Sequence, residues 1–167
     1  KAGSDTTSVD ELTFVYTVGA GHESSDLDAF ALVLGGGDAI RDAAGNDAVL
    51  SLPSGSDTNS LAFQSAIVVD GKRPSVVDVA SDVSVSPNGT YKLGDTVDIE
   101  VKFDELITVT GVPKLELETG ETDGLAVLKA GSDTTSVDEL TFVYTVGAGH
   151  ESSDLDAFAL VLGGGDA

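Results

Sequence analysis

The strongest constraint on the fold of this chain is a long internal repeat without a single mismatch. Residues 1–39 return unchanged as residues 129–167, 128 positions further on. A period of this length is too long for one solenoid unit and is close to the size of an ordinary domain. The sequence therefore predicts a tandem array of nearly identical 128-residue domains. We expect residue 1 to lie within one domain and residue 167 to lie within the next.

The repeat predicts how the chain divides. We expect residues 1–70 to be the C-terminal part of one repeat and residues 71–167 to be the N-terminal part of the next. The second part then has every strand of a repeat except the last, which leaves a sheet edge that another strand can join. That strand comes either from continuation of the same polypeptide, which we favour, or from residues 63–70 of a neighbouring chain in a filament.

The charge balance narrows the set of partners. Asp and Glu number 29 against 8 Lys and Arg, for a net charge of −21. Nucleic acid and anionic membrane surfaces are poor partners because both bind basic faces. No apolar run approaches the roughly 20 residues of a membrane span, and the absence of cysteine excludes disulfides and thiolate metal sites. Metal cations and neighbouring repeats are the expected partners.

Alternation of apolar and polar residues, with Gly, Pro and Asn at turns, predicts strands throughout and no helix longer than two turns. Within residues 96–103 the odd-numbered positions from 97 onward are apolar, whereas Asp98, Glu100 and Lys102 are expected to face water. About seven strands at this spacing predict an all-β, Ig-like sandwich. The expected strands of one repeat are residues 76–80, 96–103, 114–118, 125–129, 140–146, 158–162 (equivalent to 30–34) and 63–70.

Four segments carry a resemblance to a known family: GTYKLGDTVDIEVKFDELITVTGVPKLELETG, LTFVYTVGAGHESSDLD, RDAAGNDAVLSLP and AIVVDGKRPSV. In sequence and order they resemble the Ig-like/cadherin-like repeats of Bap-type (biofilm-associated) bacterial surface adhesins. The resemblance implies an extracellular, cell-surface stalk that serves adhesion and biofilm formation, with calcium bound between domains. The linker departs from the family pattern Asp-Thr-x-x-Pro, because residues 70–74 read Asp-Gly-Lys-Arg-Pro. Its two cations would weaken a metal site or replace the metal by ion pairs.

Ig-type topology would gather acidic groups from three places at one end of the sandwich. Asp104 and Glu105 follow the strand expected over residues 96–103, Asp42 and Asn46 lie in the loop before the last strand, and Asp70 lies in the linker. Carboxylate and amide oxygens are the ligands that Ca²⁺ prefers. We therefore expect a junction calcium site here, with solvated loop acids as the alternative.

A second acidic cluster is expected at the opposite end of the domain. Asp26 and Asp28, which recur as Asp154 and Asp156, flank a single apolar residue and could complete the junction site of the following domain. The alternative for Asp28 is a turn in which its side chain binds nearby backbone amides.

Non-enzymatic function is expected from what the repeat lacks. Each repeat has one histidine, at positions 22 and 150, and a lone loop histidine makes a poor zinc site or catalytic base. The chain has no tryptophan to form a sugar platform. The primary hypothesis is a structural module of an adhesin stalk, extracellular filament or sheath. The alternative is a calcium-dependent glycan- or protein-binding domain, whose copies should vary in their loops.

Overall fold

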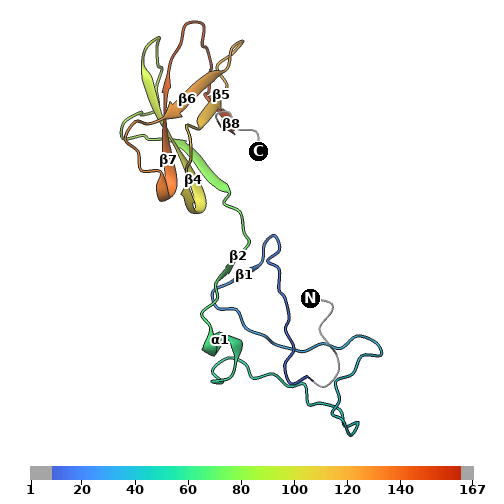
Figure 1. Ribbon diagram of the computed structural model, residues 1–167. Coiled ribbons are helices and arrows are strands. Elements are labelled where there is room, and N and C mark those ends of the chain that lie inside the picture. Colours follow the sequence, from blue (N-terminus) through green and yellow to red (C-terminus); the bar gives the residue numbers. More distant parts are fainter. Residues whose placement is uncertain (1–8, 163–167) are drawn as a thin grey trace. The chain divides into compact units, whose positions relative to one another are not determined.

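The chain divides into two compact units, Lys1–Arg73 and Pro74–Ala167, which we call the N-terminal and C-terminal units. The structure, a computed structural model, describes residues 9–162 (Figure 1). Nearly all of the regular structure in this range is β-strand, and its one helix has four residues, so the all-β prediction is confirmed there. Among the described residues, no helix has both the length and the apolar character needed to cross a membrane.

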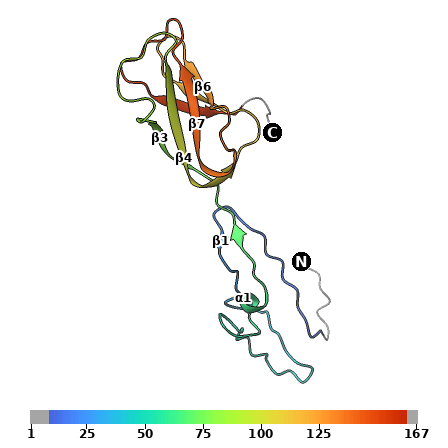
Figure 2. The ribbon, with the colours of Figure 1, turned by 90° about the vertical axis from the view of Figure 1, so that its left-hand side faces the viewer.

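A six-stranded antiparallel sheet forms the C-terminal unit and curls until it is nearly closed, like a barrel (Figure 2). Its strand order is β3-β4-β7-β6-β5-β8, so β3 and β8 are the two free edges. The strands are β3 (Val76–Ser81), β4 (Thr96–Thr108), β5 (Lys114–Leu117), β6 (Gly124–Leu128), β7 (Thr135–Thr145) and β8 (Ala157–Val161).

The core of this unit follows the predicted alternation. In β4 the side chains of Val97, Ile99 and Val101 are buried, and β7 contributes Leu140, Phe142 and Tyr144. The two strands run side by side in register, with Ile99 opposite Phe142. Residues of β5 and β6 complete the buried cluster, namely Leu115, Leu117 and Ala126.

The prediction that Asp98 faces water is wrong. Asp98 is buried because the turn over residues 82–86 and the side chain of Lys129 cover it. Its backbone amide donates to Ser86 Oγ at 2.8 Å, and its carboxylate lies 2.6 Å from Lys129 Nζ. Alternation assigns Asp98 to the outer face of β4, but it does not reveal that a loop folds over that face.

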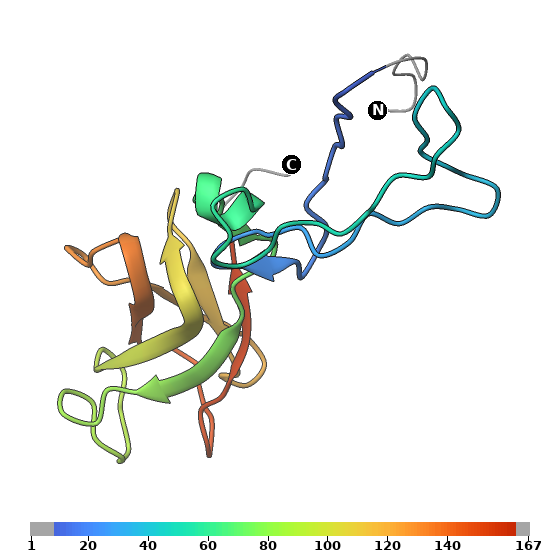
Figure 3. The same ribbon diagram turned by 90° about the horizontal axis from the view of Figure 1, so that it is seen from below.

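The described part of the N-terminal unit has little regular structure, as Figure 3 shows. It contains β1 (Glu23–Ser24), α1 (Leu61–Gln64) and β2 (Val69–Asp70). The strand expected over residues 63–70 is therefore confined to its last two residues, and residues 30–34 do not form a strand here. The short helix begins at Ser60, whose Oγ accepts from the Phe63 amide at 3.1 Å and so satisfies an otherwise free helix N–H.

The two copies of the repeated sequence have different environments. Phe142 is 0 % exposed within the sheet, whereas its identical counterpart Phe14 is 70 % exposed. Leu12 and Tyr16 are likewise exposed, although Leu140 and Tyr144 are buried. Residues 129–167 belong to the unit that contains β4, β5 and β6, and these strands supply the pairing partners and the opposing core. The burial of this sequence therefore depends on strands distant in the chain.

Candidate functional site

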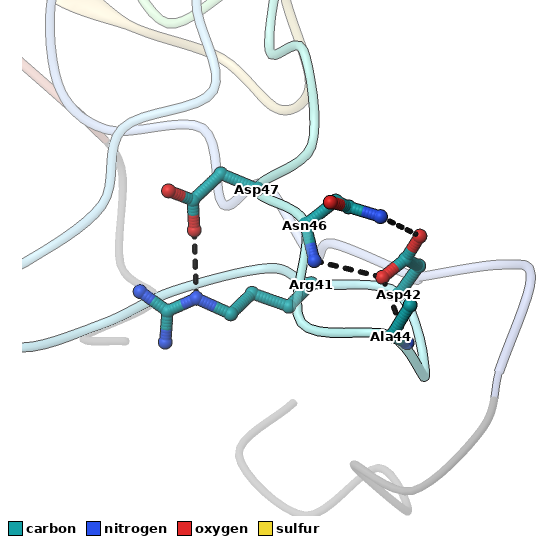
Figure 4. A network of polar contacts seen from close by, with 5 residues as sticks. All are labelled: Arg41, Asp42, Ala44, Asn46 and Asp47. Carbon is teal, nitrogen blue, oxygen red and sulfur yellow. Dashed lines mark hydrogen bonds and ion pairs between the residues drawn. The ribbon is translucent and has the colours of Figure 1, made fainter.

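The loop over residues 41–47 is closed by its own polar groups (Figure 4). Asp42 Oδ1 accepts from the amides of Ala44 and Asn46 at 2.9 and 2.8 Å, and Asn46 Nδ2 donates to Asp42 Oδ2 at 2.8 Å. Gly45 has a φ of 92°, a left-handed conformation that favours glycine. Arg41 and Asp47 join the two arms of the loop by an ion pair of 2.7 Å.

These contacts define the chemistry of the predicted ligands Asp42 and Asn46. Hydrogen bonds from the Asn46 side chain and then from its backbone amide hold the pKa of Asp42 below its usual range. Both Asp42 oxygens already accept protein N–H groups, and the Asn46 side chain presents its amide nitrogen, not its carbonyl, to Asp42. The pair stabilises the loop, and a cation that bound here would have to displace these donors.

Asp28 joins two distant segments of the N-terminal unit. Its Oδ2 accepts from the Gly55 amide at 2.8 Å, and its Oδ1 accepts from the amides of Ala29 and Ala62 at 2.9 and 3.4 Å. The Gly55 and Ala29 hydrogen bonds lower the pKa of Asp28. The contact with Ala29 is local but reaches only the next residue, whereas an Asx turn would reach the second residue on. The contacts with Gly55 and Ala62 anchor the loop before and at α1. Asp26 is exposed.

The equivalent acids in the C-terminal unit have fewer protein partners. Asp156 Oδ1 accepts from its neighbour Ala157 at 2.8 Å, as Asp28 does from Ala29. Asp154 is exposed, and its backbone carbonyl accepts from Ser152 Oγ at 3.0 Å. The segment that satisfies Asp28 in the N-terminal unit therefore has no counterpart around Asp156 among the described residues.

Asp104 and Glu105 lie inside β4, which continues to Thr108 instead of ending at residue 103 as expected. The pairing of β4 with β7 shifts between Lys102 and Ile107, so both acids occupy an irregular part of the strand. Asp104 Oδ1 accepts from the Ser75 amide at 2.8 Å, which ties the start of the unit to β4. Glu105 Oε1 is buried and has no hydrogen-bond partner among the described residues.

The predicted ligands are divided between the two units. Within residues 9–162, no group of three or more His, Cys, Asp or Glu side chains is arranged to hold a metal ion. A shared calcium site stays a prediction. The N-terminal unit contains Asp26, Asp28, Asp42, Asn46 and Asp70, of which Asp70 accepts from the Lys72 amide at 3.2 Å, and the C-terminal unit contains Asp104, Glu105, Asp154 and Asp156.

A charged cluster beside β4 was missed by the sequence reasoning. Burial, followed by repulsion from Glu139 and Asp82, raises the pKa of Glu100. The hydrogen bond and the charge of Asp98 raise the pKa of Lys129. The even-numbered acids of β4 were a visible signal for a polar face, but their ion-pair partner Lys129 lies 31 residues from Asp98 in the chain. In this cluster Lys129 is ion-paired with Asp98.

Each histidine stabilises a turn that is the same in both copies. The Nδ1 atoms of His22 and His150 lie 2.6 and 2.7 Å from the hydroxyls of Tyr16 and Tyr144. The amides of Gly19 and Gly147 donate to the same ring nitrogens at 3.2 Å. The same contacts form in both copies although the strands beside them differ. Comparison of the chain with models of protein families, with curated proteins and with solved structures gave no match.

Proposed function

We propose that this chain is a structural repeat module of a secreted or cell-surface bacterial protein, in an adhesin stalk, filament or sheath. The observation that carries the proposal is the repeat, which preserves loops as well as core positions over residues 1–39 and 129–167. A spacer gains from identical copies, whereas a module that recognises a ligand is expected to diversify its loops. The proposed structural function is a property of the whole array of repeats, so it requires no catalytic group.

The strand order supports the finer assignment to an Ig-like sandwich. Taken in chain order as A to F, the strands of the C-terminal unit run A-B-E-D-C-F. Immunoglobulin-type domains place A, B, E and D in one sheet and C, F and G in the other. Strands β6 and β7 share two paired positions, whereas β6 and β5 share four. Because β6 also pairs with β5, the two layers expected of a sandwich are joined into one strongly curved sheet.

We further propose that calcium stiffens the junctions between repeats. The buried, unpartnered Glu105 Oε1 fits a cation, because a buried polar atom needs a partner. Glu105 and the adjacent Asp104 would supply carboxylate ligands, and carbonyls, water and acids of a neighbouring repeat would complete the six to eight oxygens typical of Ca²⁺. Bound calcium would also offset the repulsion within a chain of net charge −21.

Thermal unfolding of the full chain tests this proposal. Calcium at a hundredfold excess over its dissociation constant should stabilise the folded state by about 2.7 kcal/mol relative to EDTA. Glu105→Gln should abolish the calcium response, whereas Glu121→Gln, which removes the same charge from an exposed loop residue, should preserve it. Magnesium at equal ionic strength controls for screening.

Two outcomes would contradict the calcium proposal. Superimposable melting curves in calcium and EDTA would show that the acids of the chain bind no stabilising calcium. Equal calcium responses of the two glutamate variants would remove Glu105 from the site.

A further inference from the structure

A groove of about 770 Å³ in the C-terminal unit lies between the two free edges of the sheet. One side is formed by Val79, Ala80 and Ser81 of edge strand β3. The other side is formed by residues 150–157, which lead into edge strand β8. The loop over residues 86–91 also lines the groove, and buried core side chains, including Ile99 and Tyr144, lie at its base.

The N-terminal unit shows what covers the identical sequence there. Residues 67–71 run antiparallel to residues 21–27, with Val69 paired to Ser24. The Leu27 amide donates to the Ile67 carbonyl, the Gly71 amide to the His22 carbonyl, and the Gly21 amide to the Gly71 carbonyl, each at 2.8 Å. Val69 is buried in this arrangement. A five-residue segment thus pairs with the sequence that lines the groove in the other unit.

The equivalent backbone groups of the C-terminal unit have no backbone partner among the described residues. Leu155, His150 and Gly149 correspond to Leu27, His22 and Gly21. Within residues 9–162, the Leu155 and Gly149 amides and the His150 carbonyl make no backbone hydrogen bond. The preceding turn nevertheless has the same Tyr–His and Gly–His contacts in both copies. The acceptor is therefore preformed, with its donors and its carbonyl available to a strand.

We propose that the groove binds residues 67–71 of a second copy of this chain, by strand addition. The added strand would run antiparallel to residues 149–155 and lie between β3 and the start of β8. Main-chain hydrogen bonds would supply affinity, and burial of the Val69 side chain would fix the register. Because residues 149–155 are identical to residues 21–27, the groove matches this segment without any change of sequence.

Head-to-tail association follows from where donor and acceptor lie. The donor segment belongs to Lys1–Arg73, where it is paired with residues 21–27 and must be released from them before it can join a second chain, and the groove belongs to Pro74–Ala167. An interface between two different surfaces continues from chain to chain unless its rotation closes a ring. This inference does not rest on the proposed calcium-stiffened stalk, because strand addition needs no metal and no particular location of the protein.

The first test uses the full chain and a synthetic peptide of residues 60–73, in EDTA. The peptide should slow hydrogen exchange at the Gly149 and Leu155 amides, followed by NMR. A Gly71→Ala peptide is the matched control, because a Cβ at Gly71 would collide with the Gly19 carbonyl oxygen and lie 3.1 Å from that of His22. Gly147 and His150 are the repeat counterparts of Gly19 and His22. A strand that binds in the same way should meet the same two carbonyl oxygens, so this peptide should bind at least about tenfold more weakly. Unchanged exchange at both amides, or equal affinity of the two peptides, would overturn the proposal.

The second test asks whether a second chain is the occupant. Sedimentation velocity in EDTA should show that the mass of the full chain rises with concentration. Val79→Glu places a charge in the groove and should suppress this rise, whereas Val77→Glu adds the same charge at an exposed β3 position outside the groove and should not. A wild-type chain that stays monomeric, or identical behaviour of the two variants, would defeat the assignment. Calcium is absent throughout, so failure of the calcium proposal leaves both readouts unaffected.

Discussion

At the scale of single residues, several charged side chains gather on and beside β4, where one of them is buried. Asp98 is buried with Lys129 as its ion-pair partner, and Glu100 lies two positions further along the same strand. The Lys129 ammonium group is thus the cation in a cluster that also contains the acids Asp82 and Glu139. Of the acids in this cluster, Glu100 has a raised pKa, so its ionised form is disfavoured in the folded state.

We predict that Glu100→Gln stabilises the C-terminal unit at pH 7. A carboxyl whose pKa is raised by folding stabilises the native state fully only below its unfolded pKa of about 4.5, and this stability is lost as pH rises through the folded pKa. The amide imitates the protonated acid, so the gain at pH 7 should be at most about 1 kcal/mol, the size of a solvent-screened charge pair. Urea unfolding at pH 7 and pH 4 measures it.

The sign of the pH dependence makes this prediction specific. The difference between Glu100→Gln and wild type should shrink toward zero at pH 4, because the wild-type carboxyl is then protonated. Glu121→Gln, in an exposed loop, should show no comparable gain at pH 7. A variant that is less stable than wild type at pH 7 would show that the ionised Glu100 makes a favourable contact.

At the scale of elements, β7 owes its burial to strands distant in sequence. Its first residues follow a turn, but its core side chains pack against β4, β5 and β6. The counterpart of β7 in residues 9–17 has the same propensity and alternation and yet remains outside any strand. Strand propensity mainly reflects packing against neighbours, so identical propensity produces different structures when the neighbours differ.

Phe142→Ala and Phe14→Ala test this dependence with identical side chains in identical local sequence. Removal of the fully buried Phe142 should cost about 3–5 kcal/mol through lost burial and the cavity left behind. Removal of the exposed Phe14 should change stability by no more than about 0.5 kcal/mol. Urea unfolding followed by far-UV circular dichroism gives both values. Similar losses in the two variants would mean that residues 9–17 are packed in solution as β7 is.

The same contrast explains how far sequence reasoning could go. The sequence pattern located all six strands of the C-terminal unit, although only β4, β5, β6 and β7 have buried residues and the edge strands β3 and β8 have none. It misplaced residues 63–70, where the Ser60 cap favours a helical turn over Leu61–Gln64. Turn chemistry predicted that the Asp28 side chain could bind nearby backbone amides, but not its contacts with Gly55 and Ala62, which depend on tertiary structure. Convergence of ligands from separate repeats likewise cannot be read from periodicity.

At the scale of the whole molecule, the dominant quantity is the net charge of −21. Acids outnumber bases along the entire chain, and like charges that are brought together by folding oppose the compact state. The Debye length is about 30 Å at 0.01 M salt and about 10 Å at 0.1 M, so simple salt should relieve much of this repulsion. Screening of this kind is distinct from the binding of calcium and must be measured separately.

We predict that the melting temperature of the full chain rises by several degrees between about 0.01 M and 0.5 M NaCl in EDTA. Relief of about 1 kcal/mol of repulsion corresponds to about 4–8 °C for a domain of 60–100 residues. Thermal melts by circular dichroism measure this shift, and choline chloride should reproduce it, because screening does not depend on the identity of the cation. A melting temperature that is constant or falls with salt would mean that ion pairs such as Lys129–Asp98 outweigh the net repulsion. Calcium that raises the melting temperature beyond NaCl at equal ionic strength would then report binding, since screening is already accounted for.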